Sequence, residues 1–113
     1  MRVETTEDRG IRILSCSGRM MRDGSDERLI GACDAVLENG ARLVIDLREA
    51  AWMDSSGVGA LVACAKHAAE RGAFIKVALP EDGPVRKVFK LCHLDRVFDT
   101  FRDVATAVAS YRP

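Results

Sequence analysis

The sequence predicts an α/β sandwich with a mainly parallel sheet, an N-terminal β-hairpin and about four helices. Two strand-like segments near the N-terminus are separated by Asp8-Arg9-Gly10, a short connection typical of a hairpin. After them, apolar runs alternate with stretches of helical periodicity, which favours parallel strands joined by helices. The 113 residues suffice for one hydrophobic core, so we expect a single domain over residues 1–113.

The first half of the chain is expected to contain three strands and one helix. Residues 2–7 and 11–17 are the two arms of the hairpin, and the polar, glycine-containing stretch 18–26 is predicted to be a loop. Helical spacing follows, with Gly40 as its stop, in Leu29, Ile30, Cys33, Val36 and Leu37. Residues 43–47 form an apolar run rich in branched side chains, typical of a strand covered on both faces.

The second half is expected to contain three helices and one or two strands. A helix starts near Ser56 and ends at Gly72, with one face lined by Val58, Leu61, Val62, Ala65, Ala68 and Ala69. Residues 73–79 are predicted to be a strand, 80–83 a turn and 96–98 a candidate short last strand. The third helix carries Val85, Val88, Phe89 and Cys92, and the last one Val104, Ala107, Val108 and Tyr111.

Composition excludes several classes of function. The chain has 17 basic and 17 acidic residues, so it lacks the basic excess of a nucleic-acid-binding protein. No apolar run approaches the roughly 20 residues that span a bilayer, and the charged N-terminus has no signal-peptide core. We therefore expect a cytoplasmic protein without membrane insertion. The four cysteines form no CxxC pair and have no histidine at ligand spacing, so we expect no metal site and mostly buried thiols.

The best candidate for a functional segment is residues 52–59, Trp-Met-Asp-Ser-Ser-Gly-Val-Gly, between an apolar strand and a helix. Asp54, Ser55 and Ser56 all suit a helix N-cap, and Gly57 and Gly59 let the first helical turn approach another surface. The exposed amides and the helix dipole favour an anion there. A phosphorylated serine would add negative charge beside Asp54. An ordinary capped helix start is the alternative interpretation of these residues.

Enzymatic interpretations of the same segment lack their required residues. A nucleophile elbow needs Gly two positions before the serine, where Met53 and Asp54 stand, and a P-loop triplet is absent. A dinucleotide fingerprint would need Gly in place of Val62. His67 and His93 have no paired nucleophile in the sequence. We expect neither an enzyme nor a cofactor.

Residues 52–59 after a strand ending in Asp46-Leu47 resemble the signature of STAS domains, shared by sulfate transporters and bacterial anti-sigma factor antagonists. The resemblance extends over essentially the whole chain and implies a STAS-type sandwich. It also implies an anti-sigma factor antagonist whose Ser55 is phosphorylated by a GHKL-type serine kinase that is itself the anti-sigma factor. The unphosphorylated form would bind this kinase and release the sigma factor, and a PP2C-type phosphatase would reset the switch. ATP and Mg²⁺ would belong to the kinase.

The same resemblance implies a partner-binding surface around the acceptor serine. Its expected members are Met20, Met21, Asp23, Asp54, Ser55, Ser56, Gly57, Val58 and Gly59. Packing under the loop is the alternative role for the two methionines. Many antagonists have Gly-Glu-Leu-Asp after the second strand, whereas here Arg19 replaces the Glu and the Asp is lost or displaced to Asp23. This difference keeps a second function open: a non-switching scaffold or an accessory subunit of a stress-signalling or lipid-transport assembly.

Overall fold

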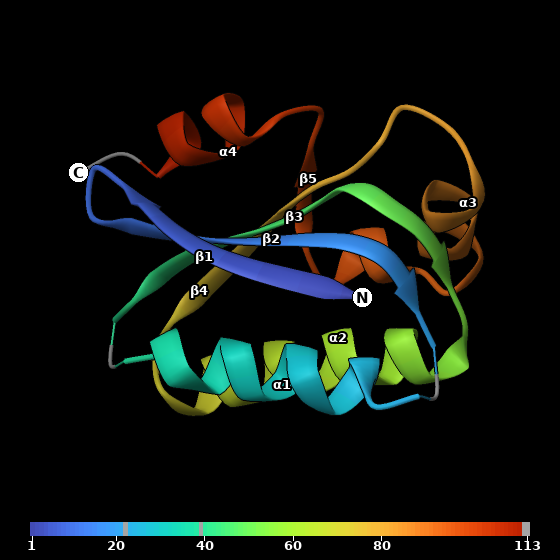
Figure 1. The fold of residues 1–113 in the computed structure, drawn as a ribbon. Coiled ribbons are helices and arrows are strands. Elements are labelled where there is room, and N and C mark those ends of the chain that lie inside the picture. The colour runs from blue at the N-terminus through green and yellow to red at the C-terminus, as the bar shows by residue number, and fades with distance from the viewer. Residues whose placement is uncertain (22, 39, 112–113) are drawn as a thin grey trace.

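A five-stranded sheet runs through the middle of the protein, with its strands side by side in the order of the chain (Figure 1). The computed structural model describes residues 1–21, 23–38 and 40–111. The strands are β1 (Arg2–Asp8), β2 (Ile11–Met20), β3 (Arg42–Met53), β4 (Phe74–Ala78) and β5 (Asp99–Phe101). β1 pairs with β2 antiparallel, and the three other pairings are parallel. The predicted fold class is confirmed.

Four α-helices connect and cover these strands: α1 (Ser25–Val36), α2 (Ser55–Glu70), α3 (Pro84–Leu91) and α4 (Val104–Ser110). A short 3₁₀ turn, η1 (Leu94–Arg96), precedes β5. α1 and α2 lie side by side on one face of the sheet, and α4 lies on the other (Figure 1). The larger core fills the space beneath α1 and α2, and includes Leu14, Leu29, Ile45, Leu61, Val77 and Phe89.

The hairpin between β1 and β2 closes as its sequence predicts. Asp8 pairs with Ile11, which leaves Arg9 and Gly10 as a two-residue turn. Both turn residues have positive φ, 55° and 81°, as the right-handed twist of the flanking strands requires. Glycine adopts such a φ at little cost, which explains its position here.

The second face of the sheet is apolar only where α4 covers it. Ala107 and Val108 of this seven-residue helix pack on Ile11, Ile13 and Val44. Beyond its reach the sheet surface turns polar, with Ser15, Ser17, Asp46 and Glu49 around a shallow hollow. Asp46 is buried there, and its carboxylate accepts two hydrogen bonds from the Arg48 guanidinium at 3.0 and 3.1 Å. The bidentate pair compensates the loss of water at that carboxylate.

The predicted boundaries of three segments are wrong. Residues 18–26 are mostly not a loop, because β2 continues to Met20 and α1 already begins at Ser25. The strand predicted over residues 43–47 is the buried part of the first half of β3, which continues to Met53. The candidate strand over residues 96–98 is also wrong. The backbone N–H of Phe98 bonds to the carbonyl of Leu94, so this segment turns helically, and β5 begins only at Asp99.

Candidate functional site

Helix α2 starts at the carboxyl end of β3, and Asp54 is its N-cap. Asp54 has extended backbone angles (φ −101°, ψ −170°), as expected for the residue that turns the chain from strand into helix. Its Oδ1 accepts the backbone N–H groups of Ser56 at 2.9 Å and Gly57 at 3.2 Å. The carboxylate therefore satisfies two helix-start donors that have no partner within the helix. Of the three cap candidates in the sequence, Asp54 fills the role.

The two serines after the cap differ in exposure and bonding. Ser56 is half-buried, and its hydroxyl donates to Asp54 Oδ1 at 2.6 Å. Ser55 is exposed, and its hydroxyl makes no hydrogen bond within residues 1–21, 23–38 and 40–111. Only the Ser55 hydroxyl is thus both accessible and unbonded in the described part of this helix start.

Gly57 is required by internal packing. A Cβ atom on this glycine would lie 2.7 Å from Met53 Cγ and 3.1 Å from both the Cβ and the carbonyl oxygen of Met20. The Met20 carbonyl also accepts the backbone N–H of Asp54 at 3.1 Å. The first turn of α2 is therefore pressed against the ends of β2 and β3. Gly57 therefore permits the close packing of α2 on Met20 and Met53. Gly59 is exposed, and a Cβ atom added to it would meet nothing within 4 Å.

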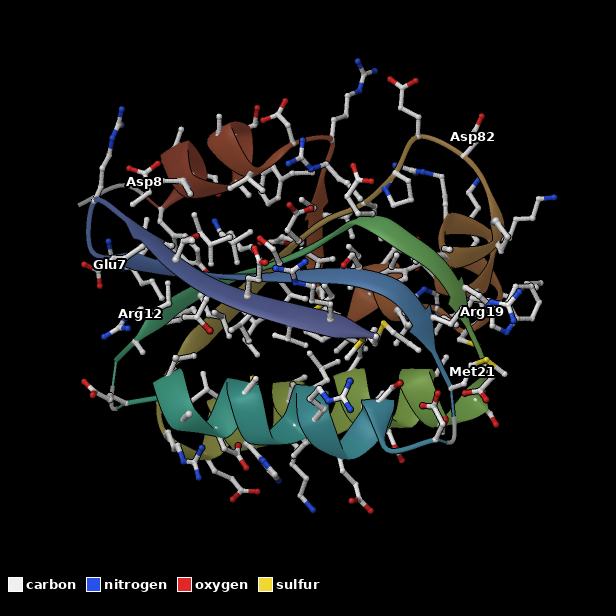
Figure 2. All side chains as sticks on the ribbon, viewed as in Figure 1. Glu7, Asp8, Arg12, Arg19, Met21 and Asp82 are labelled. Atoms are coloured by element: carbon white, nitrogen blue, oxygen red, sulfur yellow. The ribbon has the colours of Figure 1, made fainter. Side chains whose placement is uncertain are left out.

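Met20 and Met21 differ in burial, as Gly57 and Gly59 do. Met20 is fully buried at the end of β2, paired with Met53 of β3, so packing is its role and direct contact with a partner is excluded in this conformation. Buried Gly57 is likewise withdrawn from direct contact. Met21 is half-buried and remains a candidate contact. Figure 2 shows Met21 and Arg19 together at the end of the molecule opposite the hairpin turn.

Asp23 has a structural role at the start of α1. Its Oδ1 accepts both the backbone N–H of Ser25 at 3.1 Å and the Ser25 hydroxyl. These hydrogen bonds hold the pKa of the Asp23 carboxyl below its usual value, because they stabilise the ionised form. Asp23 is nevertheless exposed, so it presents a negative charge to the solvent.

The two helix starts lie at one edge of the sheet. α1 follows β2 and α2 follows β3, and because these strands are parallel neighbours, both helices point their N-termini to the same side (Figure 1). Arg19 and Trp52, opposite each other in the β2–β3 register, are exposed at this edge, with Trp52 44% exposed. Sequence reasoning missed this pairing, because the apolar pattern ends both strands before these residues.

His67 and three of the four cysteines are held inside the fold, whereas Cys92 is exposed on its surface. His67 Nδ1 lies 2.8 Å from Asp34 Oδ1, which ties α2 to α1. Cys16, Cys33 and Cys64 are buried as predicted, and burial raises the pKa of the Cys16 thiol to about 12, which suppresses the reactive thiolate. Among the described residues, no three His, Cys, Asp or Glu side chains are grouped so that they could hold a metal ion.

Comparison with known proteins agrees with this architecture. The family model described as STAS domain matches residues 2–107. The chain belongs to the STAS domain family. The match extends from β1 through most of α4, so the whole described sheet and the Ser55 segment lie inside the matched region.

Solved structures with this STAS fold include proteins named as anti-sigma factor antagonists. One from Mycobacterium paratuberculosis is 23% identical with a TM-score of 0.82, covering 99% of this chain and 94% of its own. A putative one from Thermotoga maritima is 20% identical with a TM-score of 0.84, covering 98% and 95%. The Bacillus cell fate determinant SpoIIAA in its phosphorylated form is 20% identical with a TM-score of 0.67, covering 98% and 100%.

The four α-helices of the described chain have between 7 and 16 residues. Within the described ranges 1–21, 23–38 and 40–111, none combines the length and the apolar character needed to cross a membrane.

Proposed function

We propose that this STAS domain is an anti-sigma factor antagonist of the cytoplasm, switched by reversible phosphorylation of Ser55. The observation that supports this most strongly is the contrast between the two serines. Ser55 is exposed with an unbonded hydroxyl in the described chain, whereas the Ser56 hydroxyl is held by Asp54. A kinase can reach Ser55 without breaking the cap, so phosphorylation and folding do not compete.

A phosphate on Ser55 would act on the partner surface more than on the fold. The backbone N–H groups of Ser56 and Gly57 already bond to Asp54. The phosphate would therefore not replace the cap, and it would lie beside the Asp54 carboxylate. It adds about 1.5 to 2 negative charges at neutral pH. A partner surface shaped for a neutral serine cannot compensate that charge when water is excluded, so binding weakens.

The partners that we propose are those implied by the resemblance to STAS-domain anti-sigma factor antagonists. A GHKL-type serine kinase that is also the anti-sigma factor binds the unphosphorylated domain and releases its sigma factor, and a PP2C-type phosphatase restores the serine. The contact surface on this chain consists of Ser55 with its exposed or half-buried neighbours Met21, Asp23, Asp54, Ser56, Val58 and Gly59. The domain contributes no catalytic group to the transfer, so it acts as substrate and regulatory ligand.

Arg19 is the specific observation that favours a second function. It is exposed beside the site, at a position where many antagonists carry an acidic residue. A domain with this altered edge would serve as a non-switching scaffold or as an accessory subunit of a stress-signalling or lipid-transport assembly. The two functions differ in one property, because only the switch requires phosphate transfer to Ser55.

Phosphate mapping tests the proposal. The chain is incubated with ATP, Mg²⁺ and the GHKL-type kinase encoded nearest to its gene, and phosphopeptides are sequenced by mass spectrometry. We expect one phosphate, on Ser55, in the unaltered chain and in Ser56→Ala, and none in Ser55→Ala. Phosphate on Ser56, or unchanged labelling of Ser55→Ala, contradicts the assignment.

A further inference from the structure

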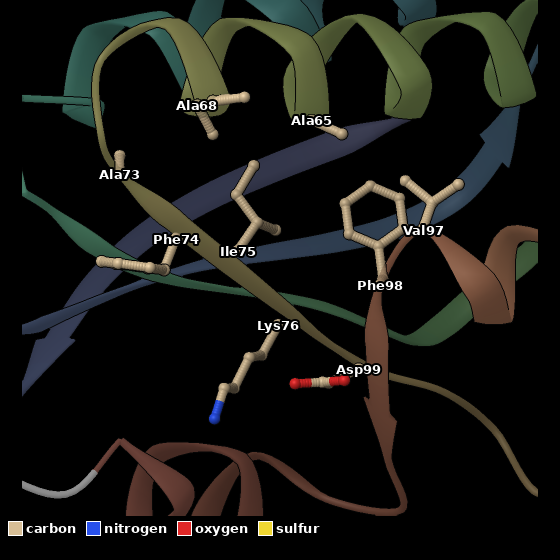
Figure 3. Close-up of a pocket in the computed structure, with 10 residues that line it drawn as sticks. Ala65, Ala68, Ala73, Phe74, Ile75, Lys76, Val97, Phe98 and Asp99 are labelled. Carbon is tan, nitrogen blue, oxygen red and sulfur yellow. The ribbon is translucent and has the colours of Figure 1, made fainter.

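The outer edge of β1 is the longer of the two open edges of the sheet. β1 has seven residues and comes first in the strand order, and no strand within residues 1–21, 23–38 and 40–111 pairs with its outer side (Figure 1). At the opposite edge, β5 has only three residues. The start of β4 next to it borders a hollow of about 240 Å³ beside the end of α2 (Figure 3). Of the two edges, β1 therefore offers the longer run of unpaired backbone groups.

Hairpin geometry determines which backbone groups of β1 face outward. In a two-residue turn, the carbonyl of the residue before the turn bonds to the N–H of the residue after it, so the backbone groups of Asp8 face β2. Successive residues of an antiparallel strand alternate in this direction, and the β1–β2 register has no shift. Val3, Thr5 and Glu7 therefore direct their N–H and C=O groups away from β2, where another strand can bond to them.

The side chains of β1 divide between the two faces of the sheet. Arg2 and Glu4 line the polar hollow beside Asp46, so the even-numbered residues of β1 lie on the polar face. Val3, on the opposite face, packs against the larger core. Thr5 shares the face of Val3 and is exposed, so α1 does not cover the edge at the middle of β1. An open edge of this length is a template for pairing with another chain, unless its charges prevent it.

The order of charges along β1 favours pairing with a second copy of the same strand. A twofold axis perpendicular to the sheet keeps every residue on its own face, so the axis must pass through a residue that pairs with itself. With Thr5 on the axis, Arg2 lies opposite Asp8 of the second copy. Glu4 then lies opposite Thr6. Within the strand, opposite charges therefore meet and no like charges do.

The neighbouring registers bring like charges together. An axis at Glu4 places the two Glu4 carboxylates opposite each other, and an axis at Thr6 places Glu4 opposite Asp8. Like charges that are directly opposite on adjacent strands destabilise the pairing. Thr5 is also the middle residue of β1, so the register with Thr5 on the axis pairs the whole strand. The sequence of β1 thus selects one register of self-pairing.

We propose that the protein forms a homodimer in which β1 pairs antiparallel with β1 of a second copy, with the twofold axis at Thr5. Thr5 then bonds to Thr5 of the second copy, and Val3 bonds to Glu7. Each such pair exchanges two N–H···O bonds, which gives roughly six between the copies. The two sheets join into one of about ten strands, a size that open sheets reach. The dimer does not rest on the proposed phosphorylation, because Ser55 follows β3, two strands away from β1.

Sedimentation velocity of the full chain over about 10 μM to 1 mM tests the dimer, a range that brackets weak association. We expect the weight-average mass to rise toward that of a dimer. Thr5→Pro removes an outward N–H that the pairing of β1 with β2 does not use, and an edge strand tolerates proline in this orientation. This variant should associate at least tenfold more weakly. A monomeric unaltered chain at 1 mM, or unchanged dimerisation of a folded Thr5→Pro, would overturn the proposal.

A charge exchange tests the register and keeps the experiment decisive if Thr5→Pro does not fold. Arg2→Asp and Asp8→Arg should each weaken association about threefold or more, because like charges then lie opposite each other. The double variant should restore it. Arg96→Asp is the matched control, since Arg96 is exposed in η1 at the opposite edge of the sheet, and it should dimerise like the unaltered chain. A double variant that associates no better than the single ones, or an equal loss in Arg96→Asp, would overturn the proposal.

Discussion

The Ser56 hydroxyl donates a hydrogen bond to the Asp54 carboxylate at 2.6 Å, while the neighbouring Ser55 hydroxyl is exposed and unbonded in the described chain. One carboxylate oxygen of Asp54 thereby accepts a side chain and two backbone N–H groups. The two adjacent serines therefore differ, since Ser56 stabilises the helix start whereas the Ser55 side chain is exposed to solvent.

This difference predicts unequal stability effects of two alanine substitutions. Ser56→Ala removes the bond to Asp54 and should lower the free energy of unfolding by about 0.5–1.5 kcal/mol. Ser55→Ala removes no hydrogen bond and should stay within about 0.5 kcal/mol of the unaltered chain. Urea unfolding followed by circular dichroism measures both. A larger loss for Ser55→Ala than for Ser56→Ala would mean that Ser55 is structural.

The two glycines of α2 form a second matched pair. Gly57→Ala places a Cβ within 2.7 Å of Met53 Cγ and should cost about 1–3 kcal/mol through overpacking. Gly59→Ala meets nothing within 4 Å and should stabilise the exposed helix by about 0.4–1 kcal/mol through its higher helix propensity. Thermal and urea melts of the two variants check the signs. Stabilisation by Gly57→Ala would contradict the described packing.

Gly59→Ala also reports on the partner surface. If a partner approaches the first turns of α2 as closely as a glycine allows, the added methyl group should weaken binding even though the domain is more stable. Calorimetric titration against the kinase measures this. Unchanged affinity for Gly59→Ala would remove Gly59 from the expected contact surface.

Asp34 links α1 to α2, and its ion pairs should make part of the protein's stability depend on pH in the acid range. Its Oδ1 is 2.8 Å from His67 Nδ1 and accepts a hydrogen bond from the Arg71 guanidinium at 3.1 Å. Desolvation alone would raise the pKa of the Asp34 carboxyl, but these two partners outweigh it and hold the pKa below its usual value. A carboxyl with a lowered folded-state pKa contributes stability above the unfolded pKa of about 3.9, and loses it as the pH falls through the folded value.

Asp34→Asn should therefore lower the free energy of unfolding at pH 7, and it should change this free energy less near pH 3. Because the pair is partly exposed, we expect at most about 1 kcal/mol at pH 7. Glu38→Gln is the control, since this exposed carboxylate makes no ion pair within the described residues. Urea unfolding at the two pH values measures both variants. An equal loss for Asp34→Asn at pH 7 and pH 3 would contradict the role of the ionised carboxylate.

The order of the elements and the start of the site could be predicted from local pattern. The hairpin follows from Asp8-Arg9-Gly10, because only certain residues adopt its positive φ angles. The start of α2 follows from Asp54 and its two serines, because capping is decided within four residues.

Contacts between distant segments could not be predicted in this way. The need for glycine at position 57 depends on Met20, which lies at the end of β2, in a stretch whose polar residues and glycines are typical of a loop. Similarly, the location of β5 depends on how Leu94 and Phe98 are buried, four residues apart in a helical turn. Three-residue strands carry too few residues to show an alternating pattern, so tertiary packing decides where they form.

The central claim is that phosphate on Ser55 controls partner binding, and calorimetric titration of the GHKL-type kinase with both forms of the domain tests it most directly. The phosphorylated form carries extra negative charge beside Asp54, which already accepts the backbone N–H groups of Ser56 and Gly57. We expect it to bind at least tenfold more weakly than the unphosphorylated form, a difference of at least about 1.4 kcal/mol. Equal affinities of the two forms would contradict the switch and favour the scaffold.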